Sequence, residues 1–551
     1  MQLDGTHSPA GVQAPAYAHR TAYLLALATV IVLGLCVRSW RLGSWPALHG
    51  DEAIQGVIAE RVIDGGLSRL TAARVYSSPV IPLMHIPLVA ALGRTAFALR
   101  LLALLSGLIS IVALYGAARR LLGQRAAYVA AAATAILPLG VILGRLGWDV
   151  AMAPPTTALA MYLGVLAWQE RRVDAAVGAG LCLALGTYVY SAAALAPVAM
   201  AVGVGVSGRL RRHLREACIV LVIVVGLSFP TVRLVSDWFS HSGTGLVAAW
   251  RYGATMGSTG EWASPLSARL AALNIVHVLD HWTGATTLEF LLGKPDERYA
   301  SLVKAVRYVC LAAWLVLLFV ASRAGAKGRF LLGYLAAVFL LGHFANPAFV
   351  NVPAKGRYLI ATLPVLALLL GLAANSCGRG GTAAKAGATV LLASWAGMAV
   401  LMLSFIGRNM VGNIEMTTTA GGDPNALAAE YLLQRVNPKD ELVLCSSWWT
   451  YWPIAYYSSE RLPMFTSDLV HAENEQVILP RDRRKVWWVQ LPFHNAPPFP
   501  AECVMEWPEV GGQARGLSIW IARDPAAAIR LTVEDYQARK AEKLRALSEP
   551  P

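Results

Sequence analysis

The chain has 551 residues, of which 56% are hydrophobic and only 15% are charged, and its formal net charge is +14. A soluble domain of this length carries more charge and fewer long apolar runs, so the composition indicates a membrane protein. The positive charge does not indicate a nucleic-acid-binding face, because the Lys and Arg residues gather in short gaps between apolar runs. The seven cysteines form no CxxC pair, so the sequence predicts neither a zinc motif nor a redox motif.

Apolar runs follow one another along the chain, each close to the length of about 17–25 residues that crosses the hydrocarbon of a bilayer. They cover residues 21–38, 97–118, 126–143, 151–168, 174–190, 192–207, 217–235, 302–321, 330–345, 358–376 and 387–407. No small-x-small cleavage site follows the first run, so we expect a retained anchor rather than a cleaved signal peptide. The sequence therefore predicts an α-helical polytopic membrane protein with about eleven transmembrane helices.

Every second gap between consecutive apolar runs is short and basic, as at residues 119–125 and 209–215. The positive-inside rule places these gaps in the cytoplasm. The N-terminal tail 1–20 is then cytoplasmic, and the chain after residue 407 is extracytoplasmic. We therefore expect a multi-pass protein of the cell inner (cytoplasmic) membrane, with a transmembrane domain at 21–407 and a first outer loop at 39–96. A mixed helical pattern in that loop predicts helices that lie on the membrane surface.

The character of the chain changes after residue 407. Residues 423–436 have the pattern of an amphipathic helix, and Asp423 is its predicted cap. Short apolar segments between Pro and Gly signals predict strands at 441–447, 485–491 and 517–523. We expect a small extracytoplasmic α/β domain at 408–525 and a charged C-terminal tail at 526–551.

Two cysteines, Cys445 and Cys503, lie in this predicted domain. An oxidising compartment permits a disulfide between them. Two unpaired thiols agree with the sequence equally well.

An acidic pair, Asp51 and Glu52, follows closely on the first apolar run, in the stretch His49-Gly50-Asp51-Glu52. A charged side chain costs about 2.5–3.5 kcal/mol at the centre of a bilayer on insertion scales, so charges beside a span indicate function by default. The simpler alternative is a pair of solvated loop residues that form salt bridges at the interface.

Further polar candidates stand in the other predicted outer loops. Arg145 and Asp149 lie in a tight turn at 144–150, and Lys355 and Arg357 end the loop 346–357. Any Lys or Arg at the end of a span can instead extend to the interface.

The spacing of His277, Asp280 and His281 places them on one helical face and can hold zinc, although a loop helix facing water explains it as well. Tyr188 and Tyr190 stand at an outer span end, where aromatic residues are ordinary and sugar stacking is the alternative.

Four stretches of the chain resemble polytopic glycosyltransferases of the GT-C type. They are His49 to Ala53, Ser78-Pro79 with 97–123, Leu137-Pro138 to Arg145 and Asp149, and Arg357-Tyr358 with Pro364. Within the GT-C type, the chain most resembles the bacterial relatives of protein O-mannosyltransferases and of aminoarabinose transferases (glycosyltransferase family 39/83-like). The resemblance covers roughly residues 20–375 and implies a GT-C transmembrane catalytic domain.

The resemblance implies an inverting glycosyltransferase that moves a single sugar from a polyprenyl-phosphate-linked donor to an acceptor hydroxyl on the outer face of the membrane. It implies that Asp51 is the general base, because the first acidic residue has this role in the family. A single base suffices for inversion, by analogy with inverting glycoside hydrolysis. Glu52 joins Asp51 in the catalytic site, where it orients Asp51, binds the acceptor or pairs with an arginine.

The substrate-binding residues follow from the same resemblance and from charge. Arg357, Lys355 and Arg145 are candidate cations for the donor phosphate, since a fixed guanidinium can meet two phosphate oxygens. Asp149 is a candidate sugar-contacting or supporting carboxylate. Tyr358, beside Arg357, and His49, beside the acidic pair, complete the predicted substrate-binding set.

The resemblance suggests metal-independent chemistry, and the adjacent positions of Asp51 and Glu52 are poor geometry for one shared cation. We predict no metal and no cofactor. The expected partners are the lipid-linked donor, a lipid, glycan or protein acceptor, and membrane lipids, without nucleic acid.

Two other functions share this hydropathy. A transporter or flippase of a lipid-linked saccharide would be expected to show internal repeats, and the sequence has no convincing repeat. A sensor with an inert anchor would not need so many spans.

Overall fold

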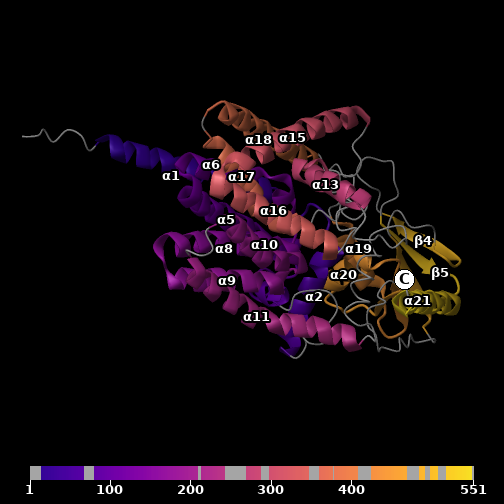
Figure 1. Cartoon of the computed structure of the whole chain (residues 1–551). Coiled ribbons are helices and arrows are strands. Elements are labelled where there is room, and N and C mark those ends of the chain that lie inside the picture. The colour runs from indigo at the N-terminus through magenta and orange to yellow at the C-terminus, as the bar shows by residue number, and fades with distance from the viewer. Residues whose placement is uncertain are drawn as a thin grey trace, which may run out of the picture.

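The computed structural model describes residues 14–67, 80–208, 213–241, 268–286, 297–345, 359–376, 378–407, 423–467, 483–490, 497–506 and 517–548. A bundle of helices forms one side of the molecule and a smaller domain with a β-sheet forms the other (Figure 1). Helix α2 (Gly50–Gly65) lies at the junction of the two, against α20 (Trp448–Ser458) of the smaller domain.

Mostly apolar helices of different lengths build the bundle. They are α1 (Ala14–Ser39), α5 (Ala96–Leu122), α6 (Gln124–Ile136), α7 (Pro138–Leu143), α8 (Ala153–Glu170), α9 (Val173–Val189), α10 (Leu195–Val206), α11 (Leu214–His241), α13 (Ala268–Thr283), α15 (Glu297–Arg323), α16 (Gly325–Ala345), α17 (Leu363–Ala374) and α18 (Gly378–Gly407). Every predicted apolar run coincides with helix in the part of the chain that is described. By length and composition, 6 helices within the described residues can cross a membrane, and others are shorter. The protein is therefore a mostly helical, multi-pass membrane protein, and the number of spans stays a prediction.

The predicted run 126–143 is not one helix, because it breaks at Leu137 between α6 and α7. Pro138 has no N–H, so the carbonyl of Thr134 has no helical partner there. The Arg38 guanidinium, at the end of α1, donates to the carbonyls of Thr134 and Ala135 over 2.9 and 2.7 Å. A broken helix inside a bundle is tolerated where neighbouring groups satisfy its backbone in this way.

The sequence pattern predicted that helix α2 lies open on a membrane surface, and the structure differs from this prediction. Most of its residues are buried, and it packs against α4 (Val80–Leu92) on one side and α20 on another. The three helices share one apolar core that includes Val57, Val89 and Tyr456. The first outer loop and the smaller domain are therefore joined by packing, which a local pattern cannot reveal.

The smaller domain contains a mixed sheet. Its strands are β1 (Glu441–Cys445), β2 (Met464–Thr466), β3 (Lys485–Gln490), β4 (Ala501–Glu506) and β5 (Ser518–Ala522), in the order β2-β1-β3-β5-β4. Strand β1 pairs in parallel with β2 and β3, whereas β5 is antiparallel to β3 and β4. The three strands predicted from sequence are the central ones, β1, β3 and β5, because burial made them apolar. The short β2 and the more exposed β4, at the edges, were not predicted.

One helix of this domain was predicted from the sequence, and a second lies in the segment that was predicted to be a separate charged tail. Helix α19 (Pro424–Arg435) begins after its cap, Asp423, whose side chain accepts from the backbone N–H of Asn425. Helix α21 (Pro525–Ser548) lies in the predicted tail, and its residues Ala528 and Ile529 are buried in a core with the sheet.

The sheet order excludes the disulfide alternative. Cys445 lies in β1 and Cys503 in β4, three strand positions away. Strands lie about 4.8 Å apart, so about 14 Å separates the two positions. A disulfide needs Cα atoms within about 7 Å.

Candidate functional site

The stretch from His49 to Glu52 forms the N-terminus of α2. His49 is the N-cap, its Nδ1 accepts from the backbone N–H of Asp51 at 3.2 Å, and its own backbone N–H donates to Glu52 Oε1 at 3.2 Å. This reciprocal arrangement is a capping box in which a histidine takes the usual place of serine or threonine. The sequence motif therefore encodes a rigid helix start.

The two acidic residues point to different surroundings. Successive residues of a helix are turned by about 100°, so adjacent side chains leave the helix in different directions. The side chain of Asp51 is 29% exposed, whereas that of Glu52 is fully buried. The pair thus separates into an accessible carboxylate and an enclosed one.

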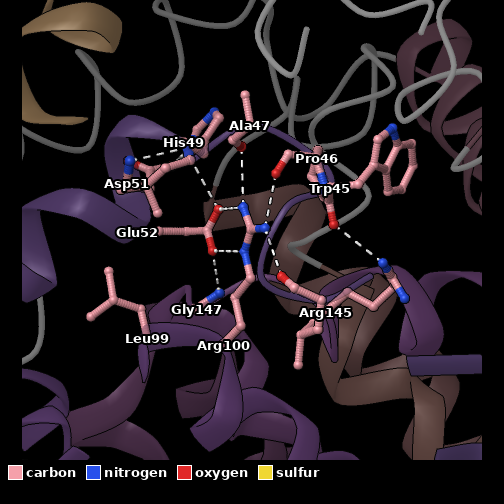
Figure 2. A network of polar contacts seen from close by, with 12 residues as sticks. Trp45, Pro46, Ala47, His49, Asp51, Glu52, Leu99, Arg100, Arg145 and Gly147 are labelled. Carbon is pink, nitrogen blue, oxygen red and sulfur yellow. Dashed lines mark hydrogen bonds and ion pairs between the residues drawn. The ribbon is translucent and has the colours of Figure 1, made fainter. Parts of the chain in front are cut away.

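Glu52 is held by Arg100 of α5, as Figure 2 shows. Arg100 donates from Nε to Glu52 Oε2 at 2.7 Å and from Nη2 to Oε1 at 2.9 Å, and both side chains are fully buried. The backbone N–H of Gly147 also donates to Oε2 at 2.8 Å. Burial alone would raise the pKa of the Glu52 carboxyl, but attraction to Arg100 and these hydrogen bonds hold it below its ordinary value. Glu52 is an ionised clamp with its oxygens occupied, which favours an orienting role over proton transfer.

Arg100 also fixes the loop that leads into α2. Its Nη1 donates to the carbonyls of Leu42 and Pro46 at 3.0 and 2.8 Å, and its Nη2 to that of Ala47 at 3.1 Å. One guanidinium therefore satisfies both the carboxylate and the backbone that precedes it.

Arg145 performs the same service at the end of α1. It donates from Nη1 to the carbonyls of Val37 and Arg38, and from Nη2 to those of Trp40 and Trp45, over 2.8 to 3.2 Å. Its side chain is 1% exposed. The last carbonyls of a helix lack partners within the helix, and Arg145 supplies them. This geometry favours a structural role in place of the predicted phosphate contact, since the guanidinium donates to four carbonyls. Figure 2 shows the bond to Trp45.

The turn with Asp149 lies beside the N-terminus of α2. The backbone N–H of Gly147 donates a hydrogen bond to Glu52, and the ring centroids of Trp148 and His49 lie 4.6 Å apart. Asp149 is half-buried, and its Oδ1 accepts from the backbone N–H of Val150. The structure therefore brings the predicted turn and the acidic pair into one region.

Three predicted substrate contacts, Lys355, Arg357 and Tyr358, lie outside the described residues. The chain is described again from Leu359, which is buried in the core of the bundle. The phosphate-binding cations stay a prediction.

The polar residues of α13 form a pair rather than a metal site. Asp280 forms an ion pair with Arg307 of α15 at 2.6 Å and accepts a hydrogen bond from the Thr286 hydroxyl at 2.5 Å. The described part of the chain contains no group of three or more His, Cys, Asp or Glu side chains placed to hold a metal, so the zinc alternative for His277 and His281 has no support there. Tyr188 donates its hydroxyl to the carbonyl of Leu227.

Two residues of the site were not predicted. Arg100 interrupts the apolar run 97–118, and a charge inside a span is a functional hypothesis by default, so this signal was present in the sequence. Asp423 was predicted only as a cap, but its Oδ2 also accepts from the backbone N–H of Leu48 at 2.7 Å and from the Tyr457 hydroxyl at 2.9 Å. Removal from water raises the pKa of the Asp423 carboxyl, against the opposing effect of these bonds. Asp423 thus ties the smaller domain to the residue before His49.

Comparisons with known proteins agree with this architecture. The family described as dolichyl-phosphate-mannose-protein mannosyltransferase matches residues 77–235. The crystal structure of ArnT from Cupriavidus metallidurans in the apo state is similar, with a TM-score of 0.57 and 14% identity over 93% of this chain and 99% of that chain. The structure of the same ArnT bound to undecaprenyl phosphate gives a TM-score of 0.55 and 14% identity over 91% of this chain and 98% of that chain. No curated protein matches in a sequence search. The chain therefore has the fold of these ArnT structures, and the family match covers residues 77–235, less than a third of its length.

Proposed function

We propose that the chain transfers a single sugar from a polyprenyl-phosphate-linked donor to an acceptor hydroxyl at the outer face of the cytoplasmic membrane, with inversion at the anomeric carbon. The observation that supports this proposal most is the difference in exposure between the two acidic side chains at the start of α2. Asp51 is accessible, and the neighbouring Glu52 is locked in an ion pair that fixes the helix start. The similarity to ArnT, which binds undecaprenyl phosphate in its crystal structure, supports the lipid carrier.

Asp51 is the general base of the proposed reaction. Its carboxylate takes the proton of the acceptor hydroxyl, and the acceptor oxygen attacks the anomeric carbon from the face opposite the phosphate. The bond between that carbon and the phosphate oxygen breaks, and polyprenyl phosphate leaves. Inversion requires one base only, as in inverting glycoside hydrolysis, and a positioned base contributes about 10²–10⁴ in rate.

Glu52, Arg100 and Arg145 preorganise that base. They satisfy the backbone between the end of α1 and His49, so the position of Asp51 is fixed before substrate binds. A reacting group held in place in advance avoids the entropic cost of orienting it during the reaction.

The remaining roles rest on the resemblance and on charge. We assign the donor phosphate to Lys355 and Arg357, with Tyr358 beside them, and a sugar or acceptor contact to Asp149. We place the N-terminal tail 1–20 in the cytoplasm and the domain 408–525, with its tail, outside, because the basic gaps between spans define the cytoplasmic side.

The test is turnover of a defined donor. Purified protein in lipid nanodiscs is incubated with a panel of radiolabelled polyprenyl-phosphate sugars and with bacterial membrane extract as the source of acceptor. We expect one donor to release polyprenyl phosphate as its label moves to an acceptor. Movement of labelled lipid across proteoliposomes without any turnover would contradict the proposal and favour a flippase.

A further inference from the structure

Two stacked indoles of the smaller domain lie beside the proposed base. Trp448 and Trp449 open α20, and their rings stack at 3.7 Å with an angle of 29° between the planes. The Trp449 ring lies 4.2 Å from the ring of His49. A Cβ placed on Gly50 would meet both indoles at 3.1 Å. The pair therefore packs against the residue that directly precedes Asp51.

The rest of α20 shows that this position is built rather than incidental. Trp452 and Tyr456, further along the helix, are buried in the core that α20 shares with α2. Trp448 and Trp449 remain half-buried at the end of the helix nearest Asp51. Gly50 leaves the space that lets two large rings approach the start of α2 so closely. Asp423, the cap of α19, accepts from the Leu48 backbone N–H and so holds the smaller domain against the residues that precede α2.

We propose that Trp448 and Trp449 form the acceptor subsite and that the acceptor presents a pyranose ring to them. This inference rests on the proposed transfer reaction and names the acceptor class for it. A pyranose has a face of C–H groups, which packs on flat aromatic rings, and an edge of hydroxyls. A ring lying on the indoles would be next to Gly50, one residue before Asp51, and in this proposal its hydroxyl edge faces that carboxylate. Ligand sites commonly combine aromatic walls with a few placed polar groups in this way.

The acceptor, rather than the donor, fits the indoles because of where they come from. In the proposed reaction the donor sugar is attached to a lipid phosphate, so it approaches from the side of the transmembrane helices. The indoles belong to the domain on the other side of α2, which carries the sheet (Figure 1). A surface on that side of Asp51 serves the molecule that approaches from outside the membrane.

The experiment separates transfer to a sugar from use of the donor alone. The donor that wild-type protein turns over is supplied with a panel of octyl glycosides, with a Ser/Thr-containing peptide, or with water only. We expect wild type to glycosylate an octyl glycoside. In Trp448→Leu we expect the KM for that glycoside to rise about tenfold, the scale of an aromatic contact, while hydrolysis of the donor by water stays within about twofold.

Trp520→Leu is the matched control, since Trp520 is a half-buried tryptophan of β5 in the same domain. It should change neither value. Trp448→Phe keeps a flat ring and should restore most of the glycoside KM; if Trp448→Leu does not fold, Trp448→Phe carries the test through a smaller rise in that KM alone.

Three results would overturn the subsite: an unchanged glycoside KM, an equal loss of donor hydrolysis, or a wild type that glycosylates the peptide and no glycoside. A wild type that turns over no donor at all would instead refute the proposed function.

Discussion

The buried pair of Glu52 and Arg100 gives the sharpest stability prediction. Glu52→Gln keeps the size of the side chain but leaves the Arg100 guanidinium without its counter-ion, where both side chains are 0% exposed. The amide N–H₂ of glutamine would also face guanidinium N–H groups. Removing one partner of a buried pair costs about 3–5 kcal/mol, and we expect the free energy of unfolding to fall by that amount.

The assay is unfolding in mixed micelles with increasing SDS, monitored by circular dichroism. The matched control is Asp51→Asn, which changes the adjacent carboxylate. Asp51 is accessible and lies in the first turn of α2, so only the helix-dipole contribution of about 0.3–1 kcal/mol is lost.

A double-mutant cycle adds a second criterion. Contacting residues should show a coupling energy of about 0.5–3 kcal/mol between Glu52→Gln and Arg100→Gln. Additive effects, or a Glu52→Gln protein within about 1 kcal/mol of wild type, would refute the clamp.

Three further predictions follow from the same region. Burial raises the pKa of Glu60 to about 7, so the folded protein binds more protons than the unfolded chain between about pH 4.5 and 7. Glu60 therefore makes stability fall as pH rises through that range. The Tm of Glu60→Gln minus that of wild type should be more positive at pH 8 than at pH 5, and an equal difference at both pH values would contradict this. Asp423→Ala should lower the free energy of unfolding by about 2–4 kcal/mol, because it removes a helix cap and leaves the buried Leu48 N–H without its acceptor. Unfolding in SDS measures this loss. Arg145→Gln should destabilise the protein by about 3 kcal/mol or more, since carbonyls lose charged donors; weaker donor binding with unchanged unfolding would restore Arg145 as a phosphate contact.

The sequence was most informative where burial imposes a local pattern. The spans are apolar because their side chains contact lipid or the core of the bundle. The central strands β1, β3 and β5 are apolar because they too are removed from water. The acidic pair was also visible, because charge stands out beside an apolar run. What a local pattern cannot show is which of two adjacent carboxylates is accessible. That depends on Arg100, whose contact with Glu52 joins positions 48 residues apart.

The contributions of the smaller domain were hidden for a related reason. Helix α20 has large aromatic residues on most of its turns and Pro453 in its interior, so it lacks the clear period of a surface helix. Its partner α2 has a mixed pattern of apolar and charged residues, so its sequence resembles that of a surface helix. Only the packing of α20 on α2 shows that this domain reaches the site.

The most direct test of the account compares single-turnover transfer by wild type and Asp51→Asn with the donor that wild type uses. We predict that the rate of transfer falls by about 10²–10⁴, while the Kd for the donor and the unfolding midpoint stay close to those of wild type. A transfer rate that is unchanged in Asp51→Asn would show that the accessible carboxylate at the start of α2 is not the base.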